Sequence, residues 1–194
     1  MRPSDSLGEY FESLAARSPT PGGGAVASLN GAQGCALMAM VGRFTKGNAL
    51  NSLVARADTA RERCLALATE DASCFADVMA AWKLPAGERD QPLQQALERA
   101  AEVPLTLIDT LQALTGDIET LESTGNPNLA TDTGIAAQQF VAAIEAARLN
   151  VLVNIRDITD DTFKGSARTR LDAASEHERR LTAVAQRITQ NLKP

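Results

Sequence analysis

The sequence predicts an all-α fold: a single domain over residues 1–194, built as a bundle of about six mostly long antiparallel helices. Alanine supplies 34 of the 194 residues and aromatic residues only 4%, which favours helices packed closely through small side chains. Apolar residues recur at helical spacing in nearly every segment, and no segment alternates cleanly as a strand would. Short connections between the segments predict antiparallel neighbours.

The first predicted helix is capped by Ser4 or Ser6 and ends near Arg17. A break follows at residues 18–24, because its prolines and three consecutive glycines do not fit a regular element. The second helix spans about residues 25–45, where a glycine-containing turn ends it.

The remaining segments share the 3.6-residue period, and their predicted spans are about residues 52–82, 88–123, 131–158 and 161–192. Pro104 lies inside the second of these and should kink or restart it. Asp160 or Asp161 can cap the last.

Composition excludes several classes of protein. The net charge of −5 at pH 7 repels phosphate backbones, so we expect no nucleic-acid partner. Three unclustered cysteines with one histidine cannot assemble a zinc set, so we expect no metal, and reduced thiols are typical of a cytoplasmic protein. The N-terminus shows no apolar signal segment, and residues 25–41 are small and polar enough to predict a buried helix rather than a membrane span.

Residues 19–24, Pro-Thr-Pro-Gly-Gly-Gly, form the most unusual segment. Glycines permit backbone conformations that are closed to other residues. Bare glycines that lead into a helix N-terminus also offer N–H donors to a carboxylate or a carbonyl oxygen. The alternative is that they simply let a neighbouring helix approach.

A carboxylate falls on the apolar face of the predicted third helix, where Asp71 follows Leu67 and precedes Cys74 at helical spacing. Burial raises the pKa of such a carboxyl unless a cation pairs with it or a donor forms a hydrogen bond to it. A structural ion pair or cap and a catalytic group both remain open for Asp71. Asn150 and Asn154 share one helix face, where they either bond neighbouring helices or line a polar cavity.

A second polar cluster surrounds the Gly-Asn-Pro-Asn sequence at residues 125–128. Asn128 or Thr131 could cap the following helix. Asp132 would then lie in its first turn, where a negative charge complements the helix dipole.

Taken together, these motifs resemble the cyclodeaminase/cyclohydrolase family, which includes the cyclodeaminase domain of formiminotransferase-cyclodeaminase and bacterial methenyltetrahydrofolate cyclohydrolases. The matching segments span nearly the whole chain in order, and they are residues 18–34, 71–75, 84–85, 103–105, 125–137 and 150–154. Pro-Thr-Pro-Gly-Gly-Gly together with Gly-Asn-Pro-Asn is a specific pair.

The resemblance implies a homodimer or larger assembly, with a folate cleft at or near an interface. It implies hydrolysis of 5,10-methenyltetrahydrofolate to 10-formyltetrahydrofolate, or cyclisation of 5-formiminotetrahydrofolate with release of ammonia. No metal or redox cofactor is expected, because the tetrahydrofolate derivative is the substrate.

Residues that match the family's motifs and are expected to bind substrate are Thr20, Gly22, Gly23, Gly24, Asn126, Asn128, Asn150 and Asn154. A carboxylate can stabilise the cationic methenyl bridge and take a proton from water; we expect Asp71 in this role, with Asp132 as the second candidate. Arg43 or Lys46 could meet the glutamate tail of the folate.

The chain departs from the family's pattern at one turn. Gly47 is usually followed there by a short lysine-rich stretch, whereas here it precedes Asn48-Ala-Leu-Asn51. A non-catalytic relative that binds folate or another small ligand on the same scaffold is therefore an alternative. A helical partner-binding protein is a second alternative.

Overall fold

The computed structural model describes residues 6–192, and every regular element in that range is a helix, as the sequence predicts. The elements are α1 (Leu7–Ala15), α2 (Gly23–Phe44), α3 (Asn51–Trp82), α4 (Ala86–Gln112), α5 (Thr115–Thr124), the short 3₁₀ helix η1 (Pro127–Leu129), α6 (Ala130–Ile155) and α7 (Asp161–Asn191). Ser6 caps α1 and Asp160 caps α7, each by accepting hydrogen bonds from backbone N–H groups of the first turn. Ser4 lies outside the described residues.

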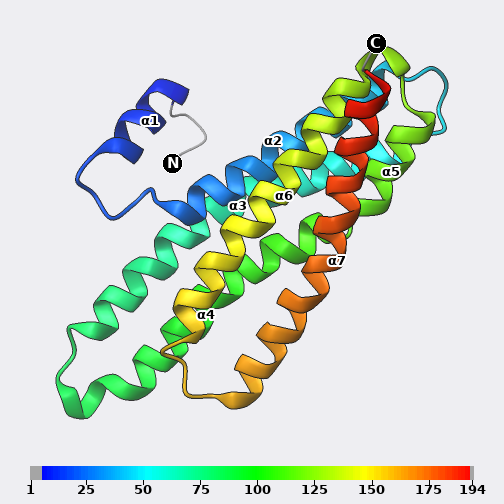
Figure 1. Ribbon diagram of the computed structural model, residues 1–194. Coiled ribbons are helices and arrows are strands. Elements are labelled where there is room, and N and C mark those ends of the chain that lie inside the picture. Colours follow the sequence, from blue (N-terminus) through cyan, green and yellow to red (C-terminus); the bar gives the residue numbers. More distant parts are fainter. Residues whose placement is uncertain (1–5, 193–194) are drawn as a thin grey trace.

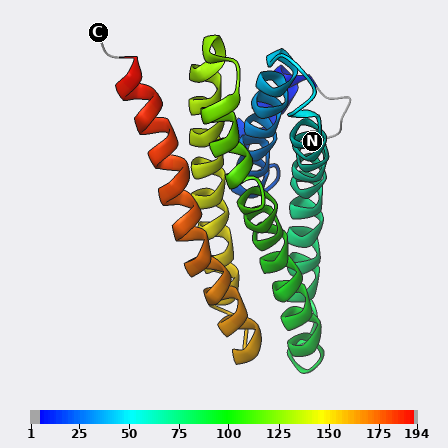
Figure 2. The ribbon, with the colours of Figure 1, turned by 90° about the vertical axis from the view of Figure 1, so that its right-hand side faces the viewer.

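Helices α2, α3, α4 and α6 form the body of the bundle (Figures 1 and 2). α2 packs between α3 and α6 and runs antiparallel to both, while α4 packs against α3 and α6 on the other side. α7 lies along α6, and its arginines pair with carboxylates of α4 and α5. α1 lies to the side of the bundle in Figure 1, and Tyr10 is its only buried residue.

Small residues on α2 let its neighbours come close. A Cβ atom on Gly34 would lie 2.5 Å from Cδ1 of Phe140, a fully buried ring on α6. α2 is long and apolar enough to cross a membrane by composition, but most of it is buried in the bundle, as in the core helix that the sequence predicts.

The predicted restart at Pro104 is wrong, because α4 continues through this residue to Gln112. Proline lacks the N–H that would normally bond the carbonyl four residues earlier, which here is Ala100. The side-chain amide of Asn154 on α6 donates to that carbonyl instead, over 3.1 Å. The helix breaks later, at residues 113–114, where α5 begins.

Candidate active site

A cleft of about 410 Å³ opens at the N-terminal end of α2, between the 18–22 loop, α3, α4 and α6. It brings together seven of the residues predicted from the sequence, namely Thr20, Gly22, Gly23, Gly24, Asp71, Asn150 and Asn154. These residues come from three distant parts of the chain. The predicted loop, the predicted carboxylate and the predicted amide pair therefore share one cavity.

Gly24 is required for close approach, and none of the three glycines has an unusual backbone geometry. Within residues 6–192, Gly47 alone has a positive φ, so the expected conformational freedom is unused at Gly22–Gly24. A Cβ atom on Gly24 would lie 2.1 Å from Oδ1 of Asp71, and one on Gly23 would lie 3.7 Å from Oδ1 of Asn150. The helix α2 begins here without a side-chain cap, so the Asp71 carboxylate lies at an uncapped helix N-terminus.

The Asp71 carboxylate has no partner among the described residues. It accepts no hydrogen bond and forms no ion pair with any residue between 6 and 192, so an ion pair or cap within that range is not its role. Burial raises the pKa of the Asp71 carboxyl. A half-buried carboxyl with no partner is available for proton transfer and for attraction to a cation.

The two asparagines of α6 combine both of the roles that the sequence left open. Nδ2 of Asn150 donates to the Ala146 carbonyl, and Nδ2 of Asn154 donates to the carbonyls of Ala100 and Asn150, over 2.9–3.1 Å. Their Oδ1 atoms accept no hydrogen bond from the described part of the chain, and both residues line the cleft. Together with Asp71 they present acceptors to a ligand rich in donors or carrying a positive charge.

One wall of the cleft was not predicted from the sequence. Phe75, Met79 and Trp82 form a partly exposed ridge along α3, and they continue from Asp71 at helical spacing. That spacing was the signal that could have identified them. Arg156 and Asp157, just beyond α6, also line the cleft, and no local pattern marks them.

Other predicted site residues lie at the opposite end of α2 and α6. Lys46, Asn126 and Asn128 line a separate cavity of about 500 Å³. Asp132 lies in the first turn of α6 as predicted, 18 positions before Asn150, which at 1.5 Å per residue is about 27 Å along the helix. Within one chain, these residues do not reach the Asp71 cleft.

Asn126 has a clear structural role at this end. Its backbone N–H donates to Oγ1 of Thr45, its Nδ2 donates to the Phe44 carbonyl, and its Oδ1 accepts from the Asn128 N–H. These bonds join the end of α2 to η1. The predicted cap of α6 is wrong, because Leu129 occupies that position and no side chain bonds the first turn there. η1 precedes α6 directly, so Asn128 falls in η1 and Thr131 falls inside α6.

Arg43 also lies away from the Asp71 cleft. It is in the last turn of α2 and pairs with Asp58 of α3. Neither Arg43 nor Lys46 lines the cleft that holds Asp71, so neither meets a ligand there within the same chain.

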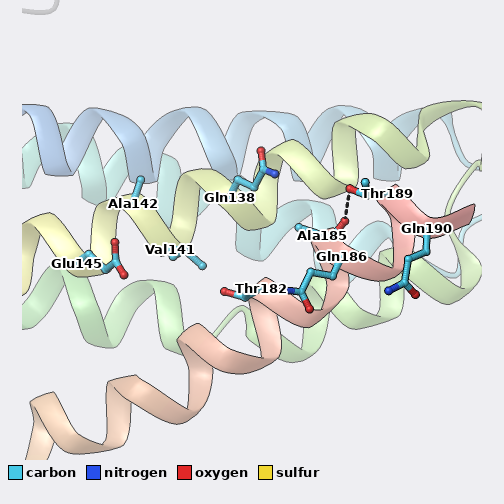
Figure 3. Close-up of a pocket in the computed structure, with 9 residues that line it drawn as sticks. All are labelled: Gln138, Val141, Ala142, Glu145, Thr182, Ala185, Gln186, Thr189 and Gln190. Atoms are coloured by element: carbon cyan, nitrogen blue, oxygen red, sulfur yellow. Dashed lines mark hydrogen bonds between the residues drawn. The ribbon is translucent and has the colours of Figure 1, made fainter. Parts of the chain in front are cut away.

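A further groove of about 470 Å³ lies between α6 and α7 (Figure 3). Neutral amides, hydroxyls and aliphatic side chains line it, and Glu145 is the only ionisable residue among them. It contains no predicted site residue. Residues 6–192 also contain no group of three or more His, Cys, Asp or Glu side chains arranged to hold a metal.

Comparison with known proteins points in one direction. Residues 6–173 match the family model described as formiminotransferase-cyclodeaminase. The rat formimidoyltransferase-cyclodeaminase is 33% identical over 193 aligned positions, which cover 92% of this chain and 36% of that protein. The chain therefore spans about a third of the length of this relative.

Shorter relatives match over most of their length. The methenyltetrahydrofolate cyclohydrolase of Methylorubrum extorquens is 29% identical, with 84% of this chain and 85% of that protein covered. The crystal structure of formiminotetrahydrofolate cyclodeaminase from Thermotoga maritima superposes with a TM-score of 0.84 and 37% identity, over 96% of this chain and 95% of that one. The chain belongs to the formiminotransferase-cyclodeaminase family.

Proposed function

We propose that this chain is a folate one-carbon enzyme. It hydrolyses 5,10-methenyltetrahydrofolate to 10-formyltetrahydrofolate, cyclises 5-formiminotetrahydrofolate with release of ammonia, or does both. The observation that carries the proposal is Asp71, a half-buried carboxylate without a partner in the described chain, in a cleft lined by free amide oxygens. The names of the relatives support the same substrate class.

In the hydrolytic direction, the methenyl bridge of the substrate is an amidinium cation, which the Asp71 carboxylate attracts. Water adds to the bridge carbon while Asp71 takes its proton, a contribution of roughly 10²–10⁴-fold to the rate. The tetrahedral adduct then breaks its bond from carbon to N5, and N5 receives the proton held by Asp71. The hydroxyl group of the adduct gives its own proton to the freed carboxylate as the formyl C=O forms. The formyl group remains on N10.

In the cyclising direction, N10 attacks the formimino carbon and its proton passes to the imino nitrogen. The carbon–nitrogen bond to the leaving ammonia then breaks, which leaves the methenyl cation. Protonated Asp71 supplies the proton that this leaving group needs. A carboxyl whose pKa is raised by burial exchanges protons in both directions more readily than an exposed one. Neither reaction is an oxidation or a reduction, so we propose that no cofactor is needed beyond the folate itself.

Other cleft residues orient the pterin in this proposal. The Oδ1 atoms of Asn150 and Asn154 accept hydrogen bonds from pterin N–H groups. The uncapped N–H groups at Gly22–Gly24, with Thr20 beside them, face the pterin carbonyl at the positive end of the α2 dipole. Each of these residues lines the same cleft as Asp71.

We also propose a homodimer formed through the outward side of α2 and α6. Residues 23–42 contain no charged side chain, although one side of α2 faces solvent. On α6 the exposed side carries Ile135, Leu149 and Val153, which are 45%, 68% and 53% exposed. Water contact with exposed apolar side chains is unfavourable, so a second copy stabilises the protein by covering them.

The dimer accounts for the predicted residues that lie far from Asp71. Antiparallel packing of α2 on the same helix of a second copy sets the C-terminal end of one beside the N-terminal end of the other. Lys46, Asn126 and Asn128 of the partner subunit then lie near the cleft, as does Asp132 of the partner subunit. We propose a cytoplasmic location, with neither nucleic acid nor membrane as partner.

Three measurements test the proposed function. Purified protein should accelerate the loss of methenyltetrahydrofolate absorbance, or release ammonia from 5-formiminotetrahydrofolate. A thermal shift with folates but no turnover in either assay would support the non-catalytic ligand-binding alternative. The absence of a lysine-rich stretch after Gly47 favours the same alternative. If folates cause no thermal shift and neither assay shows turnover, the helical partner-binding protein is favoured.

A further inference from the structure

We infer that Arg156 binds the glutamate carboxylates of the folate at the mouth of the cleft and selects substrates that carry this tail. The inference rests on the proposed function, because it takes folate as the ligand. It replaces Arg43 and Lys46 as the tail-binding cation within one chain, since both lie at the other end of α2.

Charge is the first reason. Among the described residues that line the cleft, Arg156 carries the only positive charge, whereas Asp71 and Asp157 are acidic. A folate carries its carboxylates at the end opposite the pterin. Without Arg156 the cleft would repel that end of the molecule.

Position is the second reason. Asn150 lies beside Gly23, and Arg156, whose side chain is 71% exposed, lies six positions further along the chain at the end of α6, about 9 Å at 1.5 Å per residue. The ridge of Phe75, Met79 and Trp82 runs in the same direction on α3, because α3 and α6 are both antiparallel to α2. An aromatic p-aminobenzoyl group would lie along this ridge, with the tail emerging at Arg156.

The present partner of Arg156 is replaceable. Its guanidinium binds Asp157 through two hydrogen bonds of 3.1 Å, and the side chain is 71% exposed. Exposed pairs of this kind contribute little to stability. A carboxylate of the ligand can therefore take the place of Asp157 at the same fork of donors.

The backbone that carries Arg156 is held in place. Nε2 of Gln94 on α4 donates to the Asp157 carbonyl over 3.0 Å, and Oε1 of Gln94 accepts from both the N–H and the hydroxyl of Thr159. These three bonds fix the turn after α6 against α4. The arginine is thus presented at the mouth from an ordered turn, which lowers the entropic cost of binding.

Arg89 is the rival cation. Its guanidinium stacks on the Trp82 ring at 5.0 Å from the ring centroid, although Arg89 does not itself line the cleft. If the tail crossed the other rim of the cleft, Arg89 would bind it. The test therefore includes both arginines.

The experiment compares 5,10-methenyltetrahydrofolate with 5,10-methenyltetrahydropteroate, which lacks the glutamate. We expect Arg156→Gln to raise KM for the folate about tenfold and to leave kcat unchanged, because a charge-assisted hydrogen bond to the non-reacting end is lost. KM for the pteroate should not change. Arg156→Lys should restore part of the affinity, and Arg179→Gln, which removes an equally exposed arginine paired with Glu176, should have no effect.

Equal changes of KM for both substrates, or no change for either, would overturn the inference. So would a folate-selective effect of Arg89→Gln in place of Arg156→Gln. If the wild type turns over neither substrate, the hydrolytic reaction fails, and calorimetry with tetrahydrofolate and tetrahydropteroate tests Arg156 separately. Selective loss of tetrahydrofolate affinity in Arg156→Gln supports the inference; an equal loss, or wild-type binding of neither compound, overturns it.

Discussion

The side chain of Asp71 occupies the space that any residue larger than glycine would need at position 24. A Cβ atom there would lie 2.1 Å from Oδ1 and 2.3 Å from Cγ of the carboxyl group. The glycine-rich loop and the carboxylate of α3 therefore form one unit, although 47 positions separate them (71 minus 24). A substitution at Gly24 should therefore displace the Asp71 carboxyl group, and a substitution at Asp71 should change the space beside Gly24.

Gly24→Ala should displace the carboxylate and lower the rate by about 10²-fold, because small misplacements of a catalytic group are costly. Gly165→Ala is the matched control: it is also in a helix, but nothing lies within 4 Å of its added Cβ. In an Asp71→Asn background, Gly24→Ala should lower the rate little further. Additive losses in the double variant would contradict the coupling.

Asp71→Asn should lower the rate by roughly 10²–10⁴-fold while the protein stays folded. The amide keeps the size of the side chain but removes the charge and the proton transfer. Asp77→Asn, six residues further along α3, removes a carboxylate that pairs with Arg99 over 3.5 Å and does not line the cleft. Equal rates in Asp71→Asn and the wild type would refute the carboxylate mechanism.

The stability of the protein should respond to Asp71 in a defined direction. Because burial raises the folded-state pKa of the carboxyl, the native state binds the proton more tightly than the unfolded state does. The contribution of Asp71 to stability is thus present below its unfolded-state pKa and is lost as pH rises through the folded-state pKa.

Asp71→Asn should consequently be at least as stable as the wild type at neutral pH, and the difference should vanish in acid. The urea midpoints of the wild type and of Asp71→Asn, measured from acid to neutral pH, test this prediction. An ion-paired carboxylate would behave oppositely, since its removal costs about 3–5 kcal/mol. In the wild type, the hydrolysis rate should fall as pH drops through the raised pKa, and Asp71→Asn should lack that dependence.

Asn154→Ala should destabilise the protein by about 1–3 kcal/mol, because the Ala100 carbonyl loses its donor where Pro104 offers none. Pro104→Ala restores a backbone N–H four residues after Ala100. The cost of Asn154→Ala should therefore be smaller in the Pro104→Ala background. Denaturant midpoints of the wild type, the two single variants and the double variant test this prediction. If the two losses of stability are strictly additive, the Asn154 amide does not replace the missing donor.

Leu149→Glu should convert the dimer to a monomer, because it places a charge among the exposed apolar side chains of α6 that the second copy covers. Leu65→Glu changes an exposed leucine of α3 and should leave the dimer intact. Light scattering at micromolar concentration measures both masses. A monomeric wild type would end the dimer proposal and with it any role for Lys46, Asn126, Asn128 or Asp132 at the Asp71 cleft.

The sequence by itself determined the helical class and the candidates Asp71, Asn150 and Asn154, and it narrowed two helix caps to Ser4 or Ser6 and to Asp160 or Asp161. Each of these follows from local chemistry: the 3.6-residue period, the N-cap preference, and polar residues on an apolar helix face. The separation of Asp132 from Asn150 was also fixed in the chain, since both lie on one predicted helix whose rise per residue is known.

Only the tertiary structure decided the rest, because each answer depends on atoms that are distant in sequence. Helix α4 continues through Pro104 because the side chain of Asn154, 50 positions later, donates a hydrogen bond to the Ala100 carbonyl, which lacks a backbone donor. The glycines of residues 22–24 have no positive φ angle, and Gly24 is required because the Asp71 carboxyl group fills the space of a Cβ atom. Asp71 is unpaired because no described helix brings a cation to it, and Arg156 reaches the cleft because Gln94 holds its turn on α4. Local patterns specify which groups a helix offers, whereas packing decides which of them meet.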